Sequence, residues 1–205
     1  MIFTPVSEND PRLRHECAEL TKADLRMREQ QVEIDALLDY VYGKSNKAVK
    51  GKVFDRTRPT TVGLSANQVG VMKQITIVDL SIGRKSYHDL HVLINPKIVS
   101  RSKAVVEKVE GCVNFKTIWG TTRRSRTVEV VAMDRSGNDI SLKVTGWPAI
   151  LLQHEVDHLA GRLFIDRLVD PTQADLVKQK EYDIYRKVKA DWPRKTDVSS
   201  RIVVD

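Results

Sequence analysis

Apolar residues recur at helical spacing in the first quarter of the chain. They stand at i, i+3, i+4 and i+7, which places them on one face of a helix: Ile34, Leu37, Leu38 and Val41. The pattern predicts a helix over residues 24–43, with Gly43 as its stop. Residues 44–60, KSNKAVKGKVFDRTRPT, lack this periodicity and carry many lysines and arginines, so we expect a loop there.

Short segments rich in β-branched residues follow this loop. The predicted strands are QITIVDL at 74–80, HVLI at 91–94 leading into Asn95-Pro96, AVVEKVE at 104–110, TVEVVAM at 127–133 and ISLKV at 140–144. Between the last two lies DRSGND, in which Ser136, Gly137 and Asn138 are turn-forming residues. These two strands are therefore expected to form a hairpin.

Two more helices complete the prediction. In TGWPAILLQHEVDHLAG, Pro148 suits the first turn of a helix and Gly161 suits the position just past its end. A last helix is expected at about 173–190. The 205 residues suffice for one well-packed domain. Short antiparallel strands and helices predict a single α+β domain over 1–205, with sheets packed around the histidine-bearing helix and 44–60 as a basic insertion.

Composition narrows the class of protein. Hydrophobic residues make up 41% of the chain and charged residues 30%, as in ordinary soluble proteins. The N-terminal MIFTPVSEND is unlike a secretory signal, and no apolar run reaches membrane-spanning length. Two cysteines, Cys17 and Cys112, make no disulfide framework, which favours a reducing compartment. We expect a cytoplasmic location or an organelle matrix.

HEVDH at 154–158 is the sharpest chemical signal. On a helix, His154 and His158 share one face and can reach one metal ion, with Glu155 close to a metal-bound water. A metal lowers the pKa of such water from 15.7 to about 7, and a carboxylate can then carry its proton. A chance surface pattern is the alternative, but the flanking ILLQ and HL indicate burial, where unpartnered polar groups cost several kcal/mol.

A hydrolytic site needs a third protein ligand, and the residues leave its identity open. Asp166 and Asp170 lie downstream, while Cys112 in EGCVNF could be a ligand or only a small buried residue. The segment VGLSANQVG at 62–70 offers Gln68, whose amide can donate to an oxyanion. Its alternative is a tight turn with Gln68 facing solvent.

Taken together, GLSANQVG, then EGC, then QHEVDHL are similar to the three signature motifs of the peptide deformylase family. The resemblance runs from DPRLR at 10–14 to LFIDRL at 163–168 and includes LINPKI, Arg124 and the MDRSGN turn. It implies an enzyme of protein biosynthesis that removes the formyl group from the N-terminal formyl-methionine of nascent polypeptides.

The same resemblance implies a role for each site residue. Cys112, His154 and His158 would bind the metal, typically Fe²⁺, with Zn²⁺, Ni²⁺ or Co²⁺ as alternatives. Glu155 would be the general base and then the acid. The Gln68 side chain and the Val113 backbone N–H would polarise the formyl carbonyl, and Gly63 would pair its backbone with the substrate. An apolar methionine pocket would be lined by Val62, Trp147, Ile150 and Leu151, which could equally be core residues.

Three features of the motif region depart from the family pattern. The usual EGCLS is EGCVN here, with Val113 and Asn114, the proline that commonly follows is Lys116, and Trp119 stands where many bacterial members have arginine. The insertion adds charge: residues 44–58 hold six basic side chains against Asp55 alone, out of a whole-chain net charge of +7. This segment could be a solvated loop or could hold the enzyme near ribosomal RNA phosphates.

Two rival functions remain open. A zincin-type metallopeptidase shares the histidine pair and the glutamate, but it has no need of Gln68 or Cys112. A catalytically silent deformylase-like protein that binds peptides or ribosomes would share every motif.

Overall fold

The computed structural model describes residues 2–43, 61–81, 89–170 and 175–176. Along this part of the chain run η1 Pro11–Arg14, α1 Lys22–Arg26, α2 Arg28–Val41, β1 Gly63–Ser65, η3 Ala66–Val69, β2 Ile75–Asp79, β3 Leu90–Arg101, β4 Val105–Cys112, β5 Phe115–Ser125, β6 Thr127–Met133, β7 Asp139–Thr145, α3 Trp147–Leu159, η4 Phe164–Arg167 and β8 Asp175–Leu176. Antiparallel sheets and a few helices confirm the α+β class.

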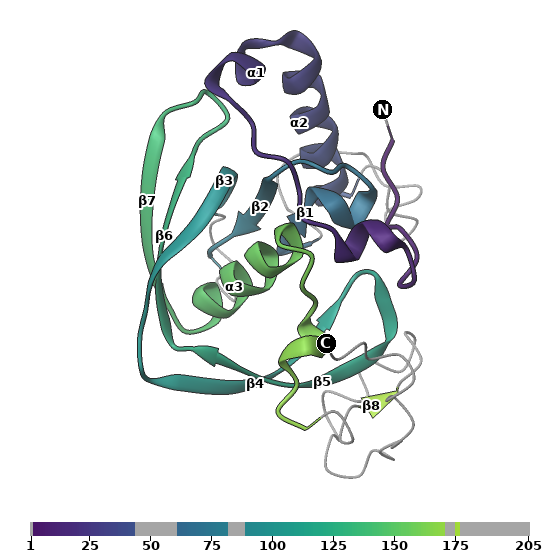
Figure 1. The fold of residues 1–205 in the computed structure, drawn as a ribbon, viewed down its shortest axis with the longest axis vertical. Coiled ribbons are helices and arrows are strands. Elements are labelled where there is room, and N and C mark those ends of the chain that lie inside the picture. Colours follow the sequence, from purple (N-terminus) through teal and green to yellow (C-terminus); the bar gives the residue numbers. More distant parts are fainter. Residues whose placement is uncertain (1, 44–60, 82–88, 171–174, 177–205) are drawn as a thin grey trace.

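Two sheets surround helix α3. One has the strand order β1-β2-β3-β6-β7, and the other has the order β4-β5-β8. Figure 1 shows α3 at the centre, with β3, β6 and β7 on one side, the long β4–β5 hairpin below and α1 and α2 at the opposite end. The predicted β6–β7 hairpin is confirmed, with Val128 opposite Val144.

The N-terminal helical region contains two helices, so the prediction of one helix over 24–43 is wrong at its start. Thr21 and Asp24 form a capping box that starts the short α1. Met27 is extended, with φ −73° and ψ 136°, and it separates α1 from α2. The predicted apolar stripe is buried on α2 and packs in one core cluster with residues of β1 and β2.

β3 continues beyond the predicted HVLI because a bulge accommodates Asn95-Pro96. The β3–β6 register shifts between Ile94 and Lys97, and Asn95 has a positive φ of 51°. The Asn95 side chain is tied to both the N–H and the C=O of Leu20, at 2.9 and 2.7 Å. The bulge therefore lets one strand run through to Arg101.

α3 is buried on nearly every face, as its apolar flanks predict. Pro148 lies in its first turn, and Gly161, with φ 69°, follows its end. A Cβ on Gly161 would lie 2.6 Å from the carbonyl oxygen of Arg14, so only glycine fits there. A helix covered on both sides can hold polar side chains away from water.

Other expectations fall partly or wholly outside the described residues. The loop at 44–60 lies outside them, and so does most of the helix predicted at about 173–190. Within that range Asp175–Leu176 form β8 against Ile118 and Trp119, so the helix is wrong at these two residues. No helix in the described part of the chain has both the length and the apolar character needed to cross a membrane.

Candidate metal centre

Helix α3 presents two histidines on one face. His154 and His158 are separated by one helical turn, and their Nε2 atoms lie 3.2 Å apart. Both are buried, with exposures of 8% and 0%. The predicted pairing of these two imidazoles is therefore present.

Cys112 ends β4 and faces the same point. Its Sγ lies 3.3 Å from His158 Nε2, and one ligand atom from each of Cys112, His154 and His158 lies within 4.8 Å of the others. Asp166, a downstream candidate, instead accepts from Arg14 and from the Leu163 N–H. Of the candidates for a third ligand, the structure brings Cys112 to the histidines.

The distances from His158 Nε2 to His154 Nε2 and to Cys112 Sγ, 3.2 and 3.3 Å, are close to those around one tetrahedral metal ion. Metal–nitrogen distances of about 2.0–2.1 Å and a metal–sulfur distance of about 2.3 Å place neighbouring ligand atoms roughly 3.3–3.6 Å apart. Burial, followed by the charges of His154 and Arg124, lowers the pKa of His158 well below its usual value, the direction that favours a neutral imidazole. The Cys/His/His group thus has the donors and the geometry of a metal site.

A network of buried charged side chains holds the His154 ring through its Nδ1 atom. His154 Nδ1 lies 2.8 Å from Glu110, leaving Nε2 to face Cys112 and His158. Arg124 donates to Glu110 at 2.6 and 2.9 Å and to Asp157 at 2.6 Å. Burial raises the pKa of Glu110, but the hydrogen bonds from His154 and Arg124 outweigh it and lower that pKa to about 2.

Glu110 and Asp157 have no role predicted from the sequence, and Arg124 enters only through the family resemblance. Two features of the sequence indicate these two carboxylates. Glu110 lies two residues before Cys112, on the same face of β4, and Asp157 lies one helical turn after His154. Neither signal shows that Arg124, from β5, joins the two carboxylates.

Glu155 lies beside the ligand group and is 3% exposed. The Ser65 hydroxyl lies 2.8 Å from its Oε2 and 2.8 Å from its backbone oxygen. Burial raises the pKa of Glu155, while the His154 charge and the Ser65 hydrogen bond oppose that rise. A carboxylate held in this way can exchange a proton with water at the site.

Gln68 faces the ligand group, so the alternative of a solvent-facing Gln68 is wrong. Its Oε1 accepts from the Ser65 N–H at 2.7 Å, which directs Nε2 to within 3.2 Å of Cys112 Sγ and 3.1 Å of His158 Nε2. The side chain is 2% exposed. Val113 follows Cys112 in the β4–β5 turn and is partly buried.

The four predicted pocket residues differ in exposure. Ile150 and Leu151 are buried, whereas Trp147 and Val62 are about half exposed, at 48% and 51%. Leu151 also belongs to the core cluster between α3 and the larger sheet. A Cβ on Gly63 would lie 2.7 Å from Leu151 Cδ1, so Leu151 is next to the β1 edge.

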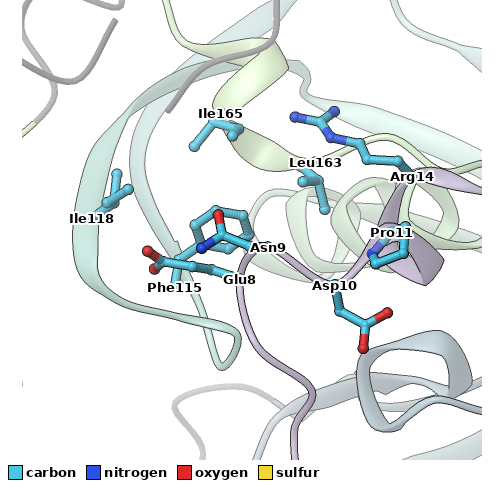
Figure 2. A pocket seen from close by; sticks show the side chains of 9 residues that line it. All are labelled: Glu8, Asn9, Asp10, Pro11, Arg14, Phe115, Ile118, Leu163 and Ile165. Atoms are coloured by element: carbon cyan, nitrogen blue, oxygen red, sulfur yellow. The ribbon is translucent and has the colours of Figure 1, made fainter. Parts of the chain in front are cut away.

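A cavity of about 190 Å³ has none of the three ligand residues in its lining. Figure 2 shows apolar Phe115, Ile118, Leu163 and Ile165 lining it together with Glu8, Asn9, Asp10, Pro11 and Arg14. Phe115 meets Phe164 edge-on, and Phe164 stacks on the His154 ring. Aromatic rings therefore stand between this cavity and the imidazoles.

Comparisons with known proteins identify the family. Residues 5–174 match the family model described as "Polypeptide deformylase". "Peptide deformylase 1" of Vibrio vulnificus is 35% identical over 171 residues, which is 83% of this chain and 88% of the relative. "Peptide deformylase" of Stenotrophomonas maltophilia is 32% identical over 181 residues, covering 88% and 95%.

Solved structures of similar proteins share the fold. Peptide deformylase 1B of Arabidopsis thaliana is 29% identical with a TM-score of 0.67, covering 93% of this chain and 89% of that one. A peptide deformylase from Legionella pneumophila is 28% identical with a TM-score of 0.66, covering 94% and 100%. A Met-Ala-Ser-bound deformylase from Acinetobacter baumannii is 25% identical with a TM-score of 0.66, covering 82% and 99%. This chain belongs to the polypeptide deformylase family.

Proposed function

We propose that this chain removes the formyl group from the N-terminal formyl-methionine of nascent polypeptides. The observation that carries the proposal is the convergence of Cys112, His154 and His158 beside Glu155 and Gln68, in a chain of the deformylase family. A zincin-type peptidase is not favoured, since it has no need of Cys112 or Gln68 at the site.

Each neighbouring group has a step in the hydrolysis. Cys112, His154 and His158 would hold the metal, which would supply a Lewis acid and lower the pKa of water. Glu155 accepts a proton from the attacking water and delivers it to the amine nitrogen as the C–N bond breaks. The Gln68 amide and the Val113 backbone N–H donate to the formyl oxygen as negative charge develops on it. Formate and a free N-terminal amine are the products.

The substrate is proposed to lie along β1, with its backbone against Gly63. Ile150, Leu151, Val62 and Trp147 would receive the methionine side chain. Support comes from the position of Leu151 next to Gly63 and from the Acinetobacter baumannii relative with Met-Ala-Ser bound. The Gly63 backbone lies against Glu155, so a substrate paired there is beside the proton carrier.

Fe²⁺ is the proposed native metal, with Zn²⁺, Ni²⁺ or Co²⁺ able to replace it. One thiolate and two imidazoles suit this range of ions. A thiolate beside ferrous iron exposes both to oxidation, so activity should decay in air and persist under anaerobic handling or with Ni²⁺. Full activity for days in aerobically purified zinc protein would make the iron assignment wrong.

Formate release from formyl-Met-Ala-Ser tests the function directly. Protein loaded with Fe²⁺ or Ni²⁺ should release formate at a rate proportional to enzyme, and Cys112→Ala should not. Absence of formate from fully metallated protein would favour the catalytically silent, peptide-binding alternative. Cleavage of an internal peptide bond instead would favour the zincin alternative.

Residues 44–58 are proposed to hold the enzyme near the ribosome surface, in the cytoplasm or an organelle matrix. Support comes from their net charge of +5 and from their place in the chain, between α2 and the β1 strand beside Glu155. Neutralising their six lysines and arginines should weaken low-salt cosedimentation with ribosomes while leaving kcat/KM on a short peptide within about twofold. Equal binding by both proteins would leave only a solvated insertion.

A further inference from the structure

Asn114, two residues after Cys112, joins three separate parts of the chain. It is 4% exposed, and its Nδ2 donates to the backbone oxygens of Gln68 and Val6, each at 2.9 Å. Both acceptors are carbonyl oxygens, so the nitrogen of the amide must face them. The Asn114 Oδ1 then lies 3.6 Å from Cys112 Sγ.

The backbone of Gln68 is where hydrogen bonds join these segments. Its carbonyl oxygen also accepts from the Val6 N–H at 2.9 Å, so it has partners in both the N-terminal segment and the Cys112 turn. Gln68 follows β1 of the five-stranded sheet, whereas Asn114 follows β4 of the other sheet. The Asn114–Gln68 hydrogen bond therefore spans two parts of the site that belong to different sheets.

We propose that Asn114 is a positioning residue, which holds the Gln68 amide in register with Cys112 and the Val113 N–H. The proposal rests on the function proposed above, because Gln68 and Val113 are the two donors to the formyl oxygen. A displacement of about 1 Å at such a site can cost on the order of 10²-fold in rate. Asn114 acts through Gln68 and does not touch the substrate.

The choice of side chain follows from the two carbonyls. One amide nitrogen carries two N–H groups and serves both, whereas a serine hydroxyl carries one proton and can serve only one. Aspartate would place carboxylate oxygens against two carbonyl oxygens. The expected order of activity is therefore wild type, Asn114→Ser, Asn114→Ala and then Asn114→Asp.

A double-mutant cycle with Gln68→Ala tests the route of the effect. Asn114→Ala should lower kcat on formyl-Met-Ala-Ser by at least about tenfold, with KM changed by less than about threefold. In the Gln68→Ala background the same substitution should lower kcat by less than about threefold. An equal loss in both backgrounds would overturn the proposal.

Amide hydrogen exchange gives a readout that needs no activity. In metal-free protein, Asn114→Ala should speed hydrogen exchange at the Val6 N–H. This N–H donates to the Gln68 carbonyl oxygen, which loses its second hydrogen bond, from Asn114, in the variant. Unchanged exchange at Val6 would overturn the link, whether or not the wild type releases formate. If Asn114→Ala does not fold, Asn114→Ser takes its place in both experiments.

Asn95→Ala is the matched control. Its amide likewise ties a distant backbone segment, at Leu20, but it lies at the β3 bulge. This variant should lose stability while keeping kcat within about twofold and leaving exchange at Val6 unchanged. A kcat loss equal to that of Asn114→Ala would reduce Asn114 to a general structural role.

Discussion

At the scale of single residues, Gly63 and Ser65 set how closely the peptide backbone approaches Glu155. A Cβ on Gly63 would lie 2.5 Å from Glu155 Oε1, which leaves no space for any larger residue without displacing the carboxylate. Ser65 holds the other carboxylate oxygen. The carboxylate is therefore confined on two sides by one short strand.

Glu155→Gln tests the proton carrier. The amide keeps the size of the side chain and can still meet Ser65, but it cannot accept a proton. Turnover should fall by about 10² to 10⁴, with metal content retained. Metal analysis alongside formate release measures both, and near-normal turnover in fully metallated Glu155→Gln would remove the residue from the mechanism.

Substrate comparison tests the methionine pocket. Losing the buried methylene and thioether contacts of methionine costs about 1–3 kcal/mol. Formyl-Met peptides should therefore exceed formyl-Ala peptides by at least about tenfold in kcat/KM. Equal values for the two peptides would show that Trp147, Ile150, Leu151 and Val62 are core or surface residues only.

At the scale of elements, the buried charge network joins β4, β5 and α3. Arg124 is 3% exposed at its side chain and pairs with Glu110 on β4 and Asp157 on α3. Arg167 adds a second cation on Asp157 at 2.9 Å. Since Glu110 also holds His154, the network links the stability of the hairpin to the orientation of a ligand.

Arg124→Met is predicted to cost about 3–5 kcal/mol of unfolding free energy, because it leaves the buried Glu110 without its arginine and removes one of the two cations on Asp157. The adjacent Arg123 provides the control. It pairs with Glu107 at the surface, with 58% of its side chain exposed, so Arg123→Met should cost at most about 1 kcal/mol. Urea unfolding measures both, and equal losses would contradict the role given to the network.

A helix or strand could be predicted from the sequence where residues close to one another along the chain determine it. The stripe of Ile34 to Val41 predicts α2 because helix packing has a 3.6-residue period. The break at Met27 depends on the Thr21 cap, and the continuation of β3 past Asn95 depends on contacts with Leu20. The periodicity of apolar residues contains neither of these. The partnership of Glu110 with Arg124 is likewise a cross-strand contact, visible only in the fold.

At the scale of the whole molecule, the candidate metal centre joins two sheets. Cys112 comes from the smaller sheet, and His154 and His158 come from α3, which packs against the larger one. A metal bound there would connect them. Metal binding is therefore expected to stabilise the whole fold as well as to supply the chemistry of the site.

Metal removal is predicted to lower the melting temperature by at least about 5 °C, because a ligand bound only by the native state stabilises it. Calorimetry of chelated and reconstituted protein measures the shift. Cys112→Ala should abolish it. Cys17→Ala should retain it, since Cys17 lies outside the ligand group of Cys112, His154 and His158.

The wide spacing of the site along the chain has a consequence for timing. Gln68 and His158 touch across 90 residues, and Cys112 and His158 across 46. Contacts between such distant residues form only after the intervening chain has been made and has folded back. During its own synthesis, this enzyme should therefore stay inert until α3 has left the ribosome. Fragments ending before Leu159 should be inactive, however well β1 to β7 pair.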